Sequence, residues 1–120
     1  MKHALIIEDN LIVSKALETK LAGLGFQSFD HVWTENAAVE AAAARTPDLI
    51  LVGDGVENGS GIEAARRISL GGSIPVLLVT GDSLRARSRL PQGASVSGPF
   101  MLRDIDNAVG EAREIADNDI

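Results

Sequence analysis

Short apolar runs separated by longer amphipathic stretches constrain the fold of this chain more than any other feature. We expect strands at five places: Ala4–Ile7, Ser28–Trp33, Leu49–Val52, Val76–Val79 and Ala94–Ser97. The first, third and fourth runs are continuously apolar, which is typical of strands whose sheet is covered on both faces, whereas the fifth is a weaker signal. The pattern therefore favours a buried parallel sheet.

The stretches between these runs carry the spacing of amphipathic helices. Five helices are expected, over Val13–Leu24, Asn36–Arg45, Gly61–Leu70, Ser83–Leu90 and Ile105–Ala116. Thr34 is the expected N-cap of the second helix, and Pro47 closes the segment that follows it. Five alternations of strand and helix predict an α/β domain, built as a single doubly wound five-stranded parallel sheet with helices on both faces. Ligands of such domains bind beyond the carboxyl ends of the strands.

Length and composition limit the classes of function. A chain of 120 residues fits one domain, and a net charge of -6 disfavours binding to nucleic acid. Cysteine is absent, which excludes disulfides, zinc–thiolate sites and thiol nucleophiles and suits the cytoplasm. We find no apolar stretch long enough for a signal peptide or a membrane span.

Oxygen-bearing side chains follow the expected strands. Glu8 and Asp9 come directly after the first strand, and two neighbouring carboxylates of this kind suit Mg2+. Alternatively, Asp9 or Asn10 caps the first helix, and the two roles are compatible because different side chains would serve them. Thr80 follows the fourth strand, where its hydroxyl would donate to a phosphoryl oxygen or bond locally to the backbone.

Other single residues predict packing and no chemistry. His3 and His31 stand alone in the sequence, and we expect neither to be a phosphotransfer histidine or a metal ligand. Trp33 is expected to be packed or half-exposed at the end of the second strand. These residues are therefore assigned no role in a site.

Six motifs together point to a known family. They are Ile6–Asn10, Gly25–Phe26, Pro47–Val52, Gly59–Ala64, Ile74–Gly81 and Pro99–Phe100. In this order and spacing, over nearly its whole length, the chain resembles a response-regulator receiver domain of two-component signalling. The resemblance implies the flavodoxin-like strand order 2-1-3-4-5 and one receiver domain over residues 1–120, without an output domain.

The resemblance also implies a phosphoryl-transfer site. In this family, a histidine kinase or a phosphotransfer protein donates a phosphoryl group to an Asp at the end of the third strand. By this likeness Glu8, Asp9 and Asp54 would hold Mg2+, and Thr80 would bind the phosphoryl group. A Lys before the Pro–Phe pair completes the family's site. Metal, ammonium and hydroxyl together offset the charge of the transferred group.

Two positions depart from the family pattern. The acceptor position lies five residues after Asp48 and eight before Gly61, and both spacings lead to Gly53, which has no nucleophile. Asp54 follows one residue late, and neighbouring residues of a strand point to opposite faces. A bulge at Gly53 would correct that direction. Gly98 stands in the position of the family's Lys, so the matching cation is also missing.

These departures favour a stand-alone receiver that is not an enzyme and acts as a protein-interaction module with lost or weakened phosphorylation. Its face would be the fourth helix, fifth strand and fifth helix, with Arg85, Arg87 and Arg89 steering it to an acidic partner. The expected partners are a histidine kinase, a phosphotransfer protein or another signalling protein, and the chain itself is expected as a monomer or weak homodimer. The alternative is a working Mg2+-dependent phosphoreceiver that uses Asp54.

A cofactor-binding protein of the flavodoxin type is a third hypothesis. The first turn after a strand argues against it, because Glu8, Asp9 and Asn10 are acidic or polar and include no glycine. Such a turn does not cradle a phosphate on its backbone amides as a glycine-rich turn does.

Overall fold

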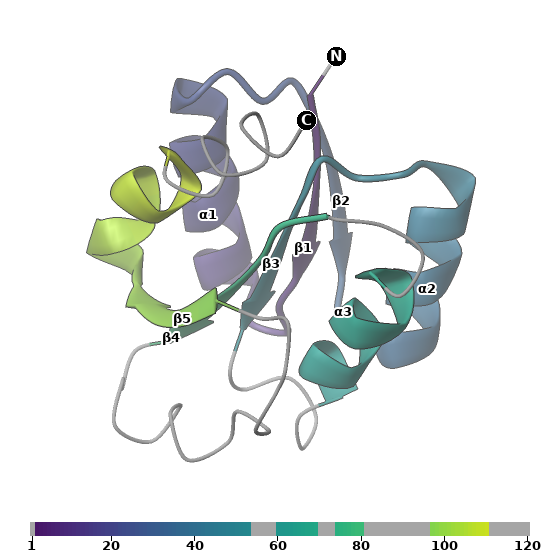
Figure 1. The fold of residues 1–120 in the computed structure, drawn as a ribbon. Helices are drawn as coiled ribbons and strands as arrows, with labels where there is room; N and C mark the ends of the chain where they lie inside the picture. The colour runs from purple at the N-terminus through teal and green to yellow at the C-terminus, as the bar shows by residue number, and fades with distance from the viewer. Residues whose placement is uncertain (1, 54–59, 70–73, 81–96, 111–120) are drawn as a thin grey trace.

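Five parallel strands form one sheet in the computed structural model, which describes residues 2–53, 60–69, 74–80 and 97–110 (Figure 1). The strands are β1 (His3–Ile7), β2 (Ser28–Val32), β3 (Leu49–Gly53), β4 (Val76–Thr80) and β5 (Ser97–Met101). Their order, β2-β1-β3-β4-β5, confirms the doubly wound sheet predicted from the sequence. The sheet reverses its direction of growth between β1 and β3, which is where ligands bind in folds of this kind.

Side-chain oxygens cap the first turns of the first two helices. The helices are α1 (Leu11–Gly23), α2 (Glu35–Ala44) and α3 (Ser60–Ser69), followed after β5 by the 3-10 helix η2 (Leu102–Asp104) and a helical segment over residues 105–110. Asn10 caps α1 by accepting the backbone N–H groups of Ile12 and Val13, and the predicted cap Thr34 accepts that of Ala37. The helix expected over Ser83–Leu90 lies outside the described residues.

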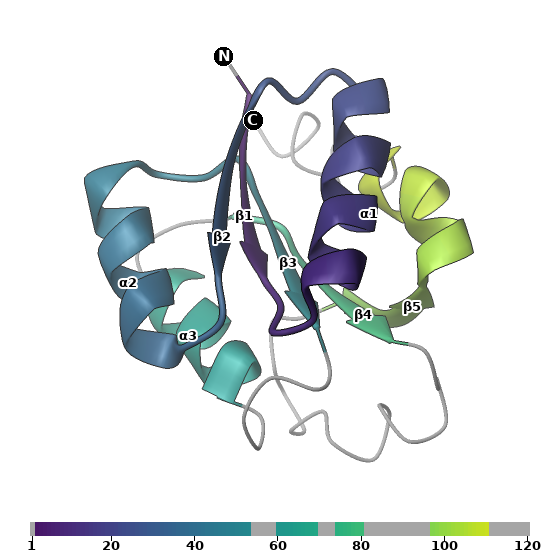
Figure 2. The same ribbon diagram turned by 180° about the vertical axis from the view of Figure 1, so that it is seen from behind.

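Helices cover both faces of the sheet. Helix α1 and residues 105–110 lie on one face, and α2 and α3 lie on the other (Figures 1 and 2). Alternate strand residues therefore enter two separate cores, so that Ala4 and Ile6 pack under α1 whereas Leu5 and Ile7 pack under α2 and α3. All five residues of β1 and of β3 are buried, which explains their continuous apolar sequence. Within the described ranges, no helix is both long and apolar enough to cross a membrane.

The fifth strand differs from its predicted position. Pro99 and Phe100 were expected to follow a strand over Ala94–Ser97, but both lie inside β5. Residues 94–96 are outside the described part of the chain. Ser97 pairs with Leu77 and Phe100 with Val79, so Gly98 and Pro99 together lie opposite Leu78 in a bulge. Because β5 is at the edge of the sheet, it tolerates a residue that lacks an N–H donor.

Candidate functional site

The carboxyl ends of β1 and β3 bring Glu8 and Gly53 side by side. Ile7 pairs with Val52 in the parallel ladder, so the next residue of each strand lies at the same edge of the sheet. The backbone N–H of Glu8 donates to the carbonyl of Val32 at 2.9 Å, which ties this turn to β2 as well. Asp9 follows and is exposed. The predicted acidic pair is thus at the edge where the fold places ligands.

The Glu8 carboxylate lies over the backbone of Gly53. A Cβ atom built on Gly53 would be 1.7 Å from Oε2 of Glu8 and 2.6 Å from its Cδ. The other carboxylate oxygen, Oε1, accepts the backbone N–H of Asn10 at 3.0 Å. The Glu8 carboxylate, from the turn after β1, therefore fills the space that a side chain of residue 53 would need.

The remaining predicted site residues are only partly placed. Asp54, the late carboxylate, lies outside the described residues. Thr80 ends β4 one position beyond Val79, the residue that pairs with Gly53, so its backbone reaches the same edge. Gly98 lies in the β5 bulge beside Leu78, short of that edge. The roles predicted for these residues stay predictions.

The described residues alone do not make a metal centre. Among them, no three Asp, Glu or His side chains form a group that would hold a metal ion. Glu8 and Asp9 have the oxygen ligands that Mg2+ prefers, but the third predicted ligand is Asp54. The magnesium site therefore stays a prediction that depends on Asp54.

A recess of about 250 Å3 opens beside the acidic pair. It is lined by Glu8, Asp9, Leu11, Ser14, His31 and Trp33. Large apolar side chains are exposed at its rim: Leu11 is 75% exposed and Trp33 is 59% exposed. Ile12, in the first turn of α1, is 82% exposed. Carboxylates and apolar surface thus lie together at this edge.

His31 joins the edge strand β2 to α1 within this recess. Its Nε2 lies 2.8 Å from Oε1 of Glu18, and its Nδ1 is hydrogen-bonded to the hydroxyl of the buried Ser14. Since a carboxylate only accepts, Nε2 carries a proton, and in the neutral imidazole Ser14 donates to Nδ1. The hydrogen bond from His31, with the nearby charge of Lys15, holds the pKa of the Glu18 carboxyl below its usual range, although burial opposes this.

His3 makes a matching connection on the other face of β2. This side chain is 3% exposed, and its Nε2 and Nδ1 lie 2.9 Å from a carboxylate oxygen of Asp30 and 2.8 Å from the hydroxyl of Ser28. Arg45 donates to the same hydroxyl at 2.6 Å. The backbone N–H of His3 donates to Asp48 at 2.8 Å, fixing the start of β3.

Both histidines stand alone in the sequence, but the structure gives each of them two side-chain partners. Their partners are 13 to 27 residues away along the chain. A usable signal was present, because Ser28 and Asp30 share one face of a strand and Ser14 and Glu18 share one face of a helix. The spacing does not predict which histidine forms hydrogen bonds with each of these two pairs.

The lowered pKa of Glu18 predicts an acid-sensitive link. A depressed carboxyl pKa stabilises the fold above the unfolded value of about 4.3, and this stabilisation is lost as pH falls through the folded value. We expect Glu18→Gln to cost about 0.5 kcal/mol of unfolding free energy at pH 7 and clearly less at pH 3. Urea unfolding at both pH values measures this difference. Glu40→Gln, which removes an exposed carboxylate from α2, is the control; an equal pH dependence in the two variants would contradict the link.

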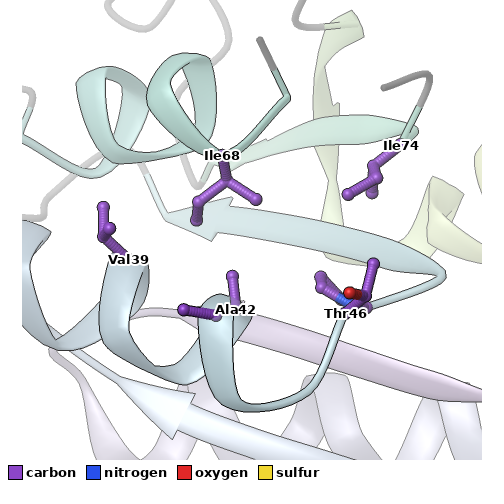
Figure 3. Close-up of a pocket in the computed structure, with 7 residues that line it drawn as sticks. Val39, Ala42, Thr46, Ile68 and Ile74 are labelled. Atoms are coloured by element: carbon purple, nitrogen blue, oxygen red, sulfur yellow. The ribbon is translucent and has the colours of Figure 1, made fainter. Parts of the chain in front are cut away.

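A second recess lies at the opposite end of the strands from Glu8 and Gly53. It has a volume of about 230 Å3 between α2, α3 and the amino ends of β3 and β4 (Figure 3). It is lined by Val39, Ala42, Ala43, Thr46, Pro47, Ile68 and Ile74. Thr46 is the one polar side chain in that lining, and the recess is remote from Glu8 and Gly53. It therefore does not belong to the candidate site.

Known proteins resemble this chain in sequence and in fold. The KDP operon transcriptional regulatory protein KdpE of Escherichia coli K12 is 34% identical over 109 residues, which are 88% of this chain and 48% of that protein. The PhyR stress response regulator is 30% identical, with a TM-score of 0.72 over 92% of this chain and 44% of that structure. A CheY-like response regulator receiver domain protein from Methanospirillum hungatei JF-1 matches the whole chain with a TM-score of 0.81 at 17% identity. This chain carries a response-regulator receiver domain.

The receiver domain spans about half the length of the two longer regulators that it matches. No family model matches its sequence. Another structural neighbour is the receiver domain of the sensor histidine kinase PA1611 from Pseudomonas aeruginosa PAO1, with a TM-score of 0.70 at 20% identity. That structure holds a magnesium ion in its active-site cleft.

Proposed function

We propose that this receiver domain acts in two-component or phosphorelay signalling as a protein-interaction module whose phosphorylation is lost or weakened. One observation carries the proposal: β3 ends in Gly53, which stands at the acceptor spacing. A glycine has no oxygen to attack phosphorus. Gly98, at the position of the expected Lys, supplies no ammonium to offset phosphoryl charge.

The partners belong to the same proposal. We expect a histidine kinase, a phosphotransfer protein or another signalling protein to bind the face made by the fourth helix, β5 and the fifth helix. Of this face, the described residues include β5 and residues 105–110, whereas Arg85, Arg87 and Arg89 lie outside them. The net charge of -6 supports a protein partner over nucleic acid. The proposal also includes that the protein is cytoplasmic, not an enzyme, and a monomer or weak homodimer.

Incubation with Mg2+ and acetyl phosphate, followed by intact mass spectrometry, tests this proposal. We expect no stable phosphoryl adduct on the wild-type chain, because the acceptor position holds glycine. A receiver domain with Asp at the acceptor position and Lys before Pro–Phe, treated in parallel, shows that the mixture is competent. An adduct that disappears in Asp54→Ala would establish the alternative, a Mg2+-dependent phosphoreceiver that uses Asp54.

A further inference from the structure

Gly53 differs from other glycines of the described chain in what surrounds it. A Cβ atom added to Gly23, Gly25 or Gly110 would meet nothing within 4 Å. At Gly53 the same atom would overlap the Glu8 carboxylate, with both oxygens within 3.2 Å. The φ angle of Gly53 is not in the left-handed region, so the backbone itself does not require glycine. The carboxylate of Glu8, at the far end of a flexible side chain, is what a side chain at position 53 would displace.

The position of Glu8 is held by the turn that follows β1. Its Oε1 accepts the N–H of Asn10, and Asn10 in turn caps α1 through its own side chain. The backbone N–H of Glu8 is bonded to Val32 of β2. Three elements therefore fix the direction from which this carboxylate reaches β3.

We propose that Glu8 is a resident occupant of the acceptor position: its carboxylate takes the place of a β3 side chain, keeps a fixed negative charge there and closes the position to a phosphoryl group. The inference rests on the proposed function, since it explains why this receiver would not depend on phosphorylation. Glu8 and Gly53 then form one functional pair. A side chain at position 53 and the Glu8 carboxylate in its present position exclude each other.

A double-mutant cycle between positions 8 and 53 tests the occupancy. In the Glu8→Ala background, Gly53→Ala should raise the folding equilibrium constant about two- to fivefold, because alanine restricts the unfolded chain. In the wild-type background the same change displaces the carboxylate and should lower that constant. We expect a coupling of about tenfold between the two positions. The matched cycle of Asp9→Ala with Gly53→Ala should be additive within about twofold, and additivity in the Glu8 cycle would overturn the occupancy.

The effect of Mg2+ on the melting temperature tests whether Glu8 closes the acceptor position. In Gly53→Asp the introduced carboxylate must compete with Glu8 for one space, whereas Glu8→Asp shortens the β1 side chain by one methylene. We expect millimolar Mg2+ to raise the melting temperature of the double variant by several degrees and that of Gly53→Asp by much less. Equal shifts in the two variants would overturn the closure.

The double-mutant cycle and the phosphorylation test can refute their two proposals independently. A phosphoryl adduct on Asp54 together with a strong coupling would refute the proposed function and leave the occupancy standing. Additivity without an adduct would refute the occupancy and leave the proposed function standing.

Discussion

Leu51→Ala is expected to lower the free energy of unfolding by about 3 kcal/mol, a large part of the stability of a domain of this size. Leu51 is fully buried in β3, between β1 and β4, and packs in the core beneath α1. Its removal leaves a cavity that the neighbouring strands do not close. Urea denaturation followed by circular dichroism measures the change, provided that the slope of the transition is unaltered.

The chain offers a matched control for this core substitution. Leu11→Ala removes the same atoms from a side chain that is 75% exposed at the start of α1. We expect this change to cost less than about 0.5 kcal/mol. Equal losses for the two variants would contradict the assignment of the core.

His3→Ala is expected to cost about 2–4 kcal/mol, the second large effect. The imidazole is almost fully buried, so its loss leaves a cavity and removes its hydrogen bonds to Ser28 and Asp30. Chemical denaturation at pH 7 measures the loss.

The second histidine provides the comparison. His31 makes the same kind of connection to a hydroxyl and a carboxylate, but its side chain is 30% exposed. Part of the His31 ring is already in contact with water, so its removal leaves a smaller cavity, and we expect His31→Ala to cost about 1 kcal/mol. A larger loss for His31→Ala than for His3→Ala would show that burial does not set these energies.

The fold could be predicted where burial dictates the sequence. Strands β1, β3 and β4 match their predicted bounds to within one residue, because strands covered on both faces read as continuous apolar runs. The caps Asn10 and Thr34 were also predictable, since their side-chain oxygens serve N–H groups that have no partner inside the helix. The edge strand β5 does not read as a continuous apolar run. It contains the bulge at Gly98 and Pro99, and its predicted bounds, Ala94–Ser97, lie too early in the chain.

The candidate site could be predicted in part. Strand order and chain direction place Glu8 and Gly53 at one edge, and sequence spacing identified both positions. The orientation of the Glu8 side chain depends on its contact with Asn10, which no pattern in the sequence specifies. The hydrogen bonds of the two histidines were missed for a similar reason. Strand and helix spacing shows which residues share a face, but it does not show which residue of another element contacts that face.

Pro99 has a consequence for how this sheet meets other chains. An edge strand offers unpaired N–H and C=O groups on which a foreign strand can add. A proline together with a bulge interrupts that row in β5, so the sheet is protected against growth on this side. The opposite edge, β2, has no proline within its five residues. Self-association by strand addition would therefore start at β2, where His3 and His31 hold the strand in place.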